Sequence, residues 1–316
     1  MAHYLLTGAA GFIGSKTAEL LLKAGHTVVG IDNLNDYYSP AVKQARIKPL
    51  IKSFKNFKFY PVDIEHLPAL KKLFEQYKFK AVINLAARAG VRYSMDHPHI
   101  YFTTNVLGTV NLLECCREFK VRKFILASTS SLYAGQKMPF KETLAVNTPI
   151  SPYAASKKGA EAACFSWHKL YGIDVSIVRY FTVYGPAGRP DMSVDIFTRN
   201  IDAGKPVEVF GDGTQSRDFT YVEDIARGTI KALKPVGFEV FNLGSDDPYK
   251  LNYMIALVEK YLGKKARVIH KPFHKADIMA TWADITKART MLGWKPTVTL
   301  EEGIKRTVDH YLQNKQ

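Results

Sequence analysis

Four consecutive hydroxyl side chains, residues 128–131, follow the apolar run "KFILA" in the segment "ASTSSLYAG". Hydroxyls at the end of a buried strand can supply a nucleophile, cap a turn or form a polar binding surface. In isolation the run favours a Ser/Thr-rich turn whose side chains bind local backbone groups. The rest of the chain decides between these interpretations.

A tyrosine and a lysine stand four residues apart in "YAASK", at Tyr153 and Lys157. On a helix this spacing places both side chains on one face. A tyrosine hydroxyl has a pKa of about 10 and is a poor base at neutral pH. A neighbouring ammonium and a cationic nicotinamide would favour the phenolate. The motif also occurs by chance, and exposed helix surface is then its ordinary interpretation.

A glycine loop, "TGAAGFIG", joins the first strand pattern to the first helix pattern, with glycines at 8, 11 and 14. Such glycines let the backbone approach a pyrophosphate, which sits at the positive N-terminus of the helix. Asp32 ends the second strand pattern, where an acid would bind both ribose hydroxyls of the adenosine. The next residue is Asn33 rather than an arginine, so the sequence predicts NAD and not NADP. Asp63, which ends the third strand pattern, is either an adenine contact or a turn residue.

Short apolar runs alternate with amphipathic stretches from "HYLLT" at residue 3 to "DVSIVRYF" at residue 181. Alternation of this kind predicts an α/β fold, a Rossmann-like doubly wound parallel sheet with helices on both faces. We expect an NAD-binding domain over 1–180, with a returning strand–helix segment near 219–244. Residues 181–316 are expected to form mainly a smaller C-terminal α/β lobe that binds the substrate.

The composition is that of an ordinary globular protein: 316 residues, 47% hydrophobic and 23% charged. No apolar stretch reaches the length of a membrane span. The strand pattern that begins at residue 3 leads us to expect no signal peptide, and the three cysteines to be reduced thiols of a cytoplasmic protein. The spacing of histidines and cysteines indicates no metal site. The net charge of +15 is spread along the chain and favours a solvated basic surface that attracts an acidic ligand.

Together these motifs resemble the extended short-chain dehydrogenases/reductases, in the NAD-dependent nucleotide-sugar epimerase/dehydratase group. The resemblance runs nearly end to end, through "TGAAGFIG", "NLAA", "NVLGT", "STSSLY", "YAASK", "RYFTVYGP", "GDGTQSRDFTYVEDIA" and "LGWKP". It implies that Thr129 binds the sugar 4-OH, that Tyr153 takes its proton, and that Lys157 holds the phenolate and the nicotinamide ribose. On this basis the hydroxyl run contains no nucleophile.

The resemblance also implies a set of further site residues. The implied cofactor contacts are Gly8, Gly11, Phe12, Ile13, Gly14, Asp32, Asn33, Asp63, Ile64, Leu85, Ala86, Ala87, Asn105, Tyr153, Lys157 and Tyr180. The implied substrate contacts are Arg92, Thr129, Ser130, Ser131, Thr182, Arg189, Arg217 and Asp277.

Ser130 and Ser131 indicate the reaction type. Dehydratases of the group resemble "TDEVYG" and carry acids at these two positions, and decarboxylases of UDP-glucuronate carry a glutamate at the position of Ser131. This chain has neither acid, and without a positioned acid/base elimination is not supported. What remains is reversible oxidation at C4, the reaction of a 4-epimerase.

The segments "GIDNLNDYYSPAVKQAR", "AGVRYS", "KMPFKE" and "FTVYGPAGRPDM" resemble the UDP-glucuronate 4-epimerases more than the UDP-glucose enzymes. Arg92 and the hydroxyls of Thr129, Ser130, Ser131 and Thr182 are candidates to receive a C6 carboxylate, although Arg92 has a surface or interface ion pair as its alternative. Arg189 and Arg217 are the pyrophosphate candidates, because a guanidinium fork suits phosphate.

Three positions depart from the group's pattern: Ala134 replaces a glycine, Arg88 stands where the glucuronate enzymes usually carry glutamine, and His274 stands where some epimerases have a phosphate-binding arginine.

Two other functions stay open, a 4-epimerase of neutral UDP-sugars and a basic, non-catalytic RNA-binding protein. The resemblance implies a homodimer through the helices after Pro98 and Ser151, with no nucleic-acid or membrane partner.

Overall fold

The computed structural model of the chain describes residues 2–272 and 278–315. The elements up to residue 184 are β1 (His3–Thr7), α1 (Phe12–Lys23), β2 (Thr27–Ile31), α2 (Pro40–Ser53), β3 (Phe57–Tyr60), α3 (Leu67–Gln76), β4 (Ala81–Asn84), α4 (Val91–Asp96), α5 (Pro98–Phe102), the π-helical turn η1 (Thr103–Leu107), α6 (Gly108–Glu118), β5 (Lys123–Thr129), the 3-10 turn η2 (Ser130–Tyr133), α7 (Pro152–Tyr171), β6 (Asp174–Tyr180) and β7 (Thr182–Tyr184). The later elements are α8 (Ser193–Asp202), β8 (Pro206–Phe210), β9 (Ser216–Tyr221), α9 (Val222–Lys231), β10 (Phe238–Leu243), β11 (Pro248–Lys250), α10 (Leu251–Leu262), β12 (Arg267–Lys271), α11 (Thr286–Leu292) and α12 (Leu300–Asn314).

The main sheet has the strand order β10-β6-β5-β4-β1-β2-β3, and all of its neighbouring strands are parallel. The order reverses between β1 and β4, so the connections run outward in both directions from the middle of the sheet. Ligands of such sheets bind at the carboxyl ends of the strands, at this reversal. The expected Rossmann-like doubly wound fold is confirmed.

The central strands are buried on both faces, which is why they are continuous apolar runs in the sequence. One face packs against α1, α2 and α9 and the other against α3, α6 and α7, and each face has its own apolar core. The helices are amphipathic, with Leu21 and Leu22 of α1 buried beside the sheet and Lys23 exposed. Burial on both faces holds the strand ends in fixed positions relative to one another.

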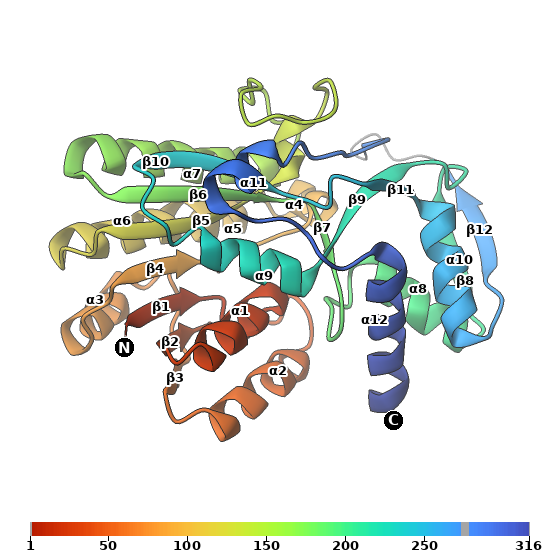
Figure 1. Cartoon of the computed structure of the whole chain (residues 1–316), viewed down its shortest axis with the longest axis horizontal. Coiled ribbons are helices and arrows are strands. Elements are labelled where there is room, and N and C mark those ends of the chain that lie inside the picture. Colours follow the sequence, from red (N-terminus) through yellow and green to blue (C-terminus); the bar gives the residue numbers. More distant parts are fainter. Residues whose placement is uncertain (1, 273–277, 316) are drawn as a thin grey trace.

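A smaller C-terminal lobe lies beside the carboxyl ends of the strands and contains α8, α10, α12 and the two-stranded sheet β8–β12 (Figure 1). It has a third apolar core, built around residues such as Phe197, Met254 and Ile304. Of the segment 219–244, β10 pairs with β6 and α9 packs on α1, so both belong to the main sheet's layers. The strand before them, β9, pairs instead with β7 and β11 in a separate sheet. The chain therefore crosses between the two lobes at this segment.

Candidate active site

A single cavity of about 1120 Å³ runs along the carboxyl ends of the central strands and into the C-terminal lobe. It brings together nearly all of the residues that the sequence predicts. Those that line it are Gly8, Gly11, Phe12, Ile13, Gly14, Asp32, Asn33, Asp63, Ile64, Leu85, Ala86, Ala87, Arg92, Thr129, Ser130, Ser131, Tyr153, Lys157, Tyr180, Thr182, Arg189 and Arg217. The glycine loop and the hydroxyl run thus belong to one site.

The glycine loop is packed so closely that side chains are excluded. Gly8 has a φ of +66°, and a Cβ at residue 14 would lie 2.0 Å from the carbonyl oxygen of Gly8. Gly11 caps α1 without a side-chain hydrogen bond, and Ile13 and Gly14 of the first turn line the cavity. A helix N-terminus that presents free N–H groups to a cavity is suited to an anion such as a pyrophosphate.

Asp32 lies at the end of β2 with a buried carboxylate, and burial raises its pKa. Two backbone N–H groups oppose this effect by donating to the carboxylate, Leu34 at 2.8 Å and Ala10 at 3.3 Å. Beside it, the Asn33 amide donates to the carboxylate of Asp63 at 2.7 Å. The row of acceptors suits ribose hydroxyls, and an added 2′-phosphate would meet the carboxylate of Asp32.

Asn105 is an exception among the expected cofactor contacts, because it lies behind the cavity wall. Its amide nitrogen donates to Ser156 Oγ at 2.9 Å and to the Arg88 carbonyl at 3.0 Å, while its oxygen accepts from the Arg88 backbone N–H at 2.8 Å. These bonds fix the backbone of Arg88, which itself lines the cavity. The Arg88 Nε is buried and has no hydrogen-bond partner within the described part of the chain.

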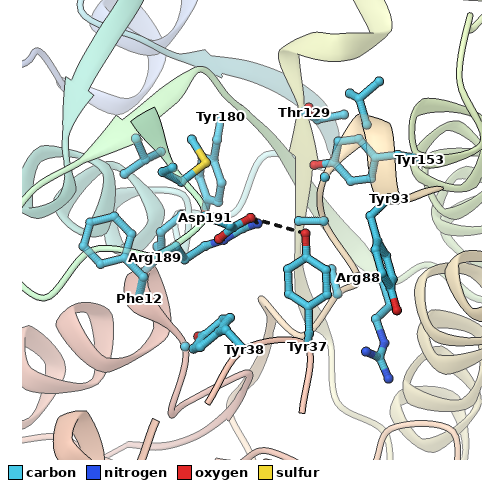
Figure 2. Close-up of a pocket in the computed structure, with 18 of the residues that line it drawn as sticks. Phe12, Tyr37, Tyr38, Arg88, Tyr93, Thr129, Tyr153, Tyr180, Arg189 and Asp191 are labelled. Carbon is cyan, nitrogen blue, oxygen red and sulfur yellow. Dashed lines mark hydrogen bonds and ion pairs between the residues drawn. The ribbon is translucent and has the colours of Figure 1, made fainter. Parts of the chain in front are cut away.

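The catalytic candidates come from two elements that meet at the cavity. Thr129 is the last residue of β5, and Tyr153 and Lys157 lie on α7, whose N-cap Ser151 accepts from the Ala154 N–H at 3.2 Å. Figure 2 shows the Tyr153 ring beside Thr129, whose hydroxyl acts to lower the pKa of the phenol. The structure therefore brings together the three residues that the resemblance implies.

Burial dominates the protonation of both helix residues. It raises the pKa of Tyr153, against which the hydrogen bond from Thr129 and the charge of Arg189 act in the opposite direction. Burial lowers the pKa of Lys157 to about 8, partly offset by the charge of Glu161. The Lys157 ammonium donates to the carbonyl of Ala127 at 2.8 Å. An amine with a pKa of about 8 can exchange protons near neutral pH, whereas the phenol needs nearby positive charge to do so.

The hydroxyl run has both local and site-directed roles. Thr129 Oγ1 accepts from the Ser131 N–H at 3.1 Å, so the turn interpretation is correct for this residue. Ser128 borders the cavity, but its hydroxyl donates to Glu161 at 2.7 Å. Thr129, Ser130 and Ser131 line the cavity. The run therefore caps η2 and presents a polar surface at the same time.

The arginines lie at different parts of the cavity. Arg189 is close enough to Tyr153 for its charge to lower the pKa of that phenol, and it pairs with Asp191, Nε to Oδ1 at 3.0 Å. The Arg92 guanidinium lies 4.0 Å from the centre of the Phe210 ring, on the wall formed by the C-terminal lobe. Arg217 lies on β9 and donates to the Ser216 carbonyl at 2.8 Å. Two residues named from the sequence lie outside the described residues. They are Asp277, the remaining expected substrate contact, and His274, which departs from the group's pattern.

Sequence reasoning missed the tyrosines of "NDYYSP". Tyr37 donates to Asp191 at 3.2 Å across the cavity (Figure 2). The Tyr38 hydroxyl accepts at 2.7 Å from Arg46, which also donates to the carbonyls of Ala187 and Gly188. The loop after β2 thus joins the loop that carries Arg189. In the sequence these residues are only two adjacent tyrosines in a polar loop, a pattern that does not predict Asp191 or Arg46 as their partners.

Two further classes of site are absent from the described part of the chain. None of its helices is long and apolar enough to cross a membrane. Residues 2–272 and 278–315 contain no group of three or more histidine, cysteine or acidic side chains placed to hold a metal ion. The three cysteines are free and buried.

Comparison with known proteins places the chain in one family. The model of the GDP-mannose 4,6-dehydratase family matches residues 5–307. A UDP-glucuronate 4-epimerase of Thermodesulfobacterium geofontis is 56% identical over 99% of this chain and 97% of its own length. The crystal structure of a Bacillus cereus UDP-glucuronic acid 4-epimerase, in complex with UDP-glucuronic acid and NAD, superposes with a TM-score of 0.92 at 39% identity, over 98% of this chain and 99% of that one.

A second solved structure is nearly as similar in shape. The Thermotoga maritima UDP-glucose 4-epimerase with UDP-glucose has a TM-score of 0.89 at 33% identity, over 98% of this chain and 99% of that one. The resemblance found in the motifs is confirmed. The chain belongs to the GDP-mannose 4,6-dehydratase family, within the nucleotide-sugar epimerase/dehydratase group of the extended short-chain dehydrogenases/reductases.

Proposed function

We propose that this protein is an NAD-dependent 4-epimerase that interconverts UDP-glucuronate and UDP-galacturonate through a 4-keto sugar. The observation that carries the proposal is the composition of the cavity's catalytic end. Thr129, Tyr153 and Lys157 meet there, and hydroxyls at Ser130 and Ser131 stand where dehydratases have acids. The 56% identical UDP-glucuronate 4-epimerase supports the same reaction.

The cofactor end of the cavity fits NAD. The glycines pack so closely against neighbouring backbone that the loop and the N-terminus of α1 border the cavity, where a pyrophosphate can approach the backbone, and the carboxylate of Asp32 suits unmodified ribose hydroxyls. When bound, NAD supplies an acceptor that takes the C4 hydride and returns it. Lys157 binds the nicotinamide ribose and provides the positive charge that favours the phenolate of Tyr153.

The chain's own residues move the proton. Thr129 binds the sugar 4-OH and holds it against Tyr153, whose oxygen takes the hydroxyl proton as C4 is oxidised and gives it back when C4 is reduced. Between these events the 4-keto sugar turns its other face to the cofactor. The two half-reactions use the same base, so no second acid is needed at Ser130 or Ser131.

The polar wall suits a C6 carboxylate. Ser130, Ser131 and Thr182 line the cavity together with Arg92. Oxidation at C4 leaves a ketone β to this carboxylate, which loses CO₂ most easily when it stands perpendicular to the ring. Hydroxyl donors that hold the carboxylate away from that geometry, and keep it solvated as an anion, let the hydride return first.

A neutral UDP-sugar is the second candidate substrate, because the Thermotoga maritima UDP-glucose 4-epimerase shares the fold closely. The test is to incubate the purified protein with NAD and either UDP-glucuronate or UDP-glucose, and to identify the products by proton NMR. We expect UDP-galacturonate to form much faster than UDP-galactose. Faster conversion of UDP-glucose would reject glucuronate as the substrate and keep the 4-epimerase chemistry.

We further infer a homodimer in the cytoplasm. Large apolar side chains are exposed on neighbouring helical segments: Phe102 of α5, Leu107 of η1, and Phe165 and Leu170 of α7. A second copy would cover them in an isologous contact. Light scattering should give twice the 35.5 kDa chain mass. We also propose that the chain divides into an NAD-binding domain over 1–180 and a substrate-binding lobe over 181–316.

A further inference from the structure

An ion pair is buried directly behind the catalytic end of β5. Glu161 lies on α7, one turn after Lys157, and its carboxylate accepts from the Arg179 guanidinium at 2.9 Å and 2.7 Å. The two side chains are only 5% and 3% exposed. Burying two charges costs desolvation that an apolar pair would avoid, so a pair in this position is weak evidence for a role in stability alone.

The carboxylate also binds the strand that carries Thr129. Ser128 donates to Glu161 Oε1 at 2.7 Å, the same oxygen that accepts from Arg179 Nε. Ser128 and Arg179 are register partners in the β5–β6 pair. Glu161 therefore joins β5, β6 and α7 at one point, one residue before Thr129.

A second bond joins the same helix to the same strand. Lys157 donates to the carbonyl of Ala127, the residue before Ser128. Two consecutive residues of β5 are thus bound to two consecutive turns of α7. Tyr153 begins this helix and Thr129 ends this strand, so these bonds set the position of one relative to the other.

The segment after Thr129 is bound to the same pair. Arg179 Nη1 donates to the Tyr133 hydroxyl at 2.8 Å, and Tyr133 in turn donates to Asn242 of β10 at 2.8 Å. Tyr133 is the last residue of η2. The ion pair therefore holds the chain on both sides of Thr129.

The charge of Glu161 reaches the catalytic lysine. Burial lowers the pKa of Lys157, and Glu161 acts against this by favouring the ammonium. The other groups that face Glu161 are Arg179 from β6, Tyr133 from η2 and, on its own helix, Lys158 at 4.0 Å and Cys164. The pair thus combines geometric and electrostatic support for the catalytic residues.

We propose that Glu161, held by Arg179 and Ser128, is a positioning residue that fixes the hydroxyl of Thr129 against Tyr153 and keeps the ammonium of Lys157 beneath them. The inference rests on the proposed function, and it assigns no contact with substrate to the ion pair. The geometry makes two separable claims, one about turnover and one about the protonation of Tyr153.

The turnover test uses Glu161→Gln, which keeps the shape and removes the charge. We expect kcat to fall about 10- to 100-fold, the cost of a small misplacement at a reacting centre, with KM for UDP-glucuronate changed less than about twofold. The double variant Glu161→Leu with Arg179→Met removes both charges and should recover thermal stability but not kcat. Recovery of kcat with stability would overturn the proposal, since the pair would then be only structural.

The matched control is Asp174→Asn, which breaks the Lys123–Asp174 ion pair at the other end of the same two strands. It should lower thermal stability and leave kcat unchanged. An equal loss of kcat in this control and in Glu161→Gln would reject a specific role for Glu161. If Glu161→Gln does not fold, the double variant and Glu161→Asp, which retains the charge, carry the same comparison of kcat with stability.

The protonation test needs no substrate. Tyr153 faces Thr129 from β5, Arg189, Tyr101 from α5 and Lys157 on its own helix. Direct loss of a carboxylate lowers the pKa of a nearby phenol, whereas loss of the Thr129 bond and of the Lys157 charge raises it. We expect the pKa of Tyr153 to rise in Glu161→Gln, measured by carbon-13 NMR of ζ-labelled tyrosine and assigned with Tyr153→Phe. An unchanged or lower pKa would overturn the proposal, even in a protein whose substrate is not UDP-glucuronate.

Discussion

Strands β5 and β6 take part in two ion pairs, one at each end of the sheet. The Lys123–Asp174 pair at the amino end is partly buried, and the Arg179–Glu161 pair at the carboxyl end is buried. At the amino end Lys123 pairs with Asp174 at 2.5 Å, and its ammonium also donates to Ser176 Oγ and the Lys234 carbonyl. Asp174 accepts from two N–H groups of the turn before β10. At the carboxyl end Arg179 pairs with Glu161 behind Thr129. The first pair joins the two strands to each other, and the second joins the sheet to α7, which carries Tyr153 and Lys157.

The role of each ion pair follows from the end of the sheet at which it lies rather than from its chemistry. Parallel α/β sheets bind ligands at the carboxyl ends of their strands. Neither Lys123 nor Asp174 lines the cavity, while Ser128, Thr129 and Tyr180 at the other end do. Variants at the two ends should therefore separate stability from activity.

The largest effect is expected at the carboxyl end, from Tyr153→Phe. Loss of the proton acceptor should lower kcat by about 10²- to 10⁴-fold, while UDP and NAD binding change little, because only the phenolic oxygen is removed. Steady-state kinetics and calorimetric titration measure the two quantities. Tyr184→Phe, which removes hydroxyl bonds to Thr299 and Leu300 in the C-terminal lobe, is the control and should keep its kcat. Substantial turnover by Tyr153→Phe would mean that another group is the base.

At the amino end, Asp174→Asn should reduce stability without touching catalysis. The substitution leaves Lys123 charged and buried without its carboxylate partner, which lowers the free energy of unfolding by roughly 3–5 kcal/mol in such sites. Denaturant unfolding followed by fluorescence measures the loss, and kcat at 25 °C should stay at the wild-type value. A fall in kcat larger than the fall in the folded fraction would show that the ion pair at the amino end also affects catalysis, against this prediction.

Arg92→Ala tests the wall of the cavity formed by the C-terminal lobe, where we propose that the C6 carboxylate binds. A charge-assisted bond contributes about 1.5–3 kcal/mol, so UDP-glucuronate should bind about 10- to 150-fold more weakly, and UDP much less so. Arg92 also stacks on Phe210, so its loss can disturb the cavity wall as well as remove a charge. Equal weakening of UDP and UDP-glucuronate would place Arg92 at the nucleotide end.

The smallest expected effect concerns the product ratio of Ser131→Glu. A carboxylate beside the substrate anion should slow epimerisation and raise the share of turnovers that end in a UDP-pentose. Ser131→Gln is the matched neutral control and should slow epimerisation with a smaller change in that share. Chromatography after long incubation measures the ratio of UDP-pentose to UDP-galacturonate. An identical ratio in wild type and both variants would leave Ser131 as a turn residue only.

The sequence predicts the residues that line the cavity, whereas it does not predict the ion pairs. The glycine loop, Asp32 and the Tyr153–Lys157 spacing are local patterns that predict the site in combination, and all of these residues line the cavity. The strand and helix order followed from apolar periodicity, because strands buried on both faces are continuous apolar runs. These features need no knowledge of which elements meet.

The partners of the buried charges could not be predicted, because they depend on packing between elements distant in sequence. Glu161 reads as one polar position on a lysine-rich helix face, and its partner lies on the following strand. Tyr37 and Asp191 are 154 positions apart. Asn105 was expected to contact the cofactor, but its amide is occupied by Arg88 and Ser156. A polar residue near a site does not reveal by its type whether it faces the ligand or supports the wall.

In the proposed reaction, C4 of the sugar is oxidised and reduced within one site. The most direct measurement is to convert UDP-glucuronate that carries deuterium at C4, in ordinary water, and to examine C4 of the product by NMR. We expect UDP-galacturonate that retains the deuterium, because the hydride removed from C4 is the one returned to its opposite face. Product with hydrogen from water at C4, or a UDP-pentose as the main product, would contradict it.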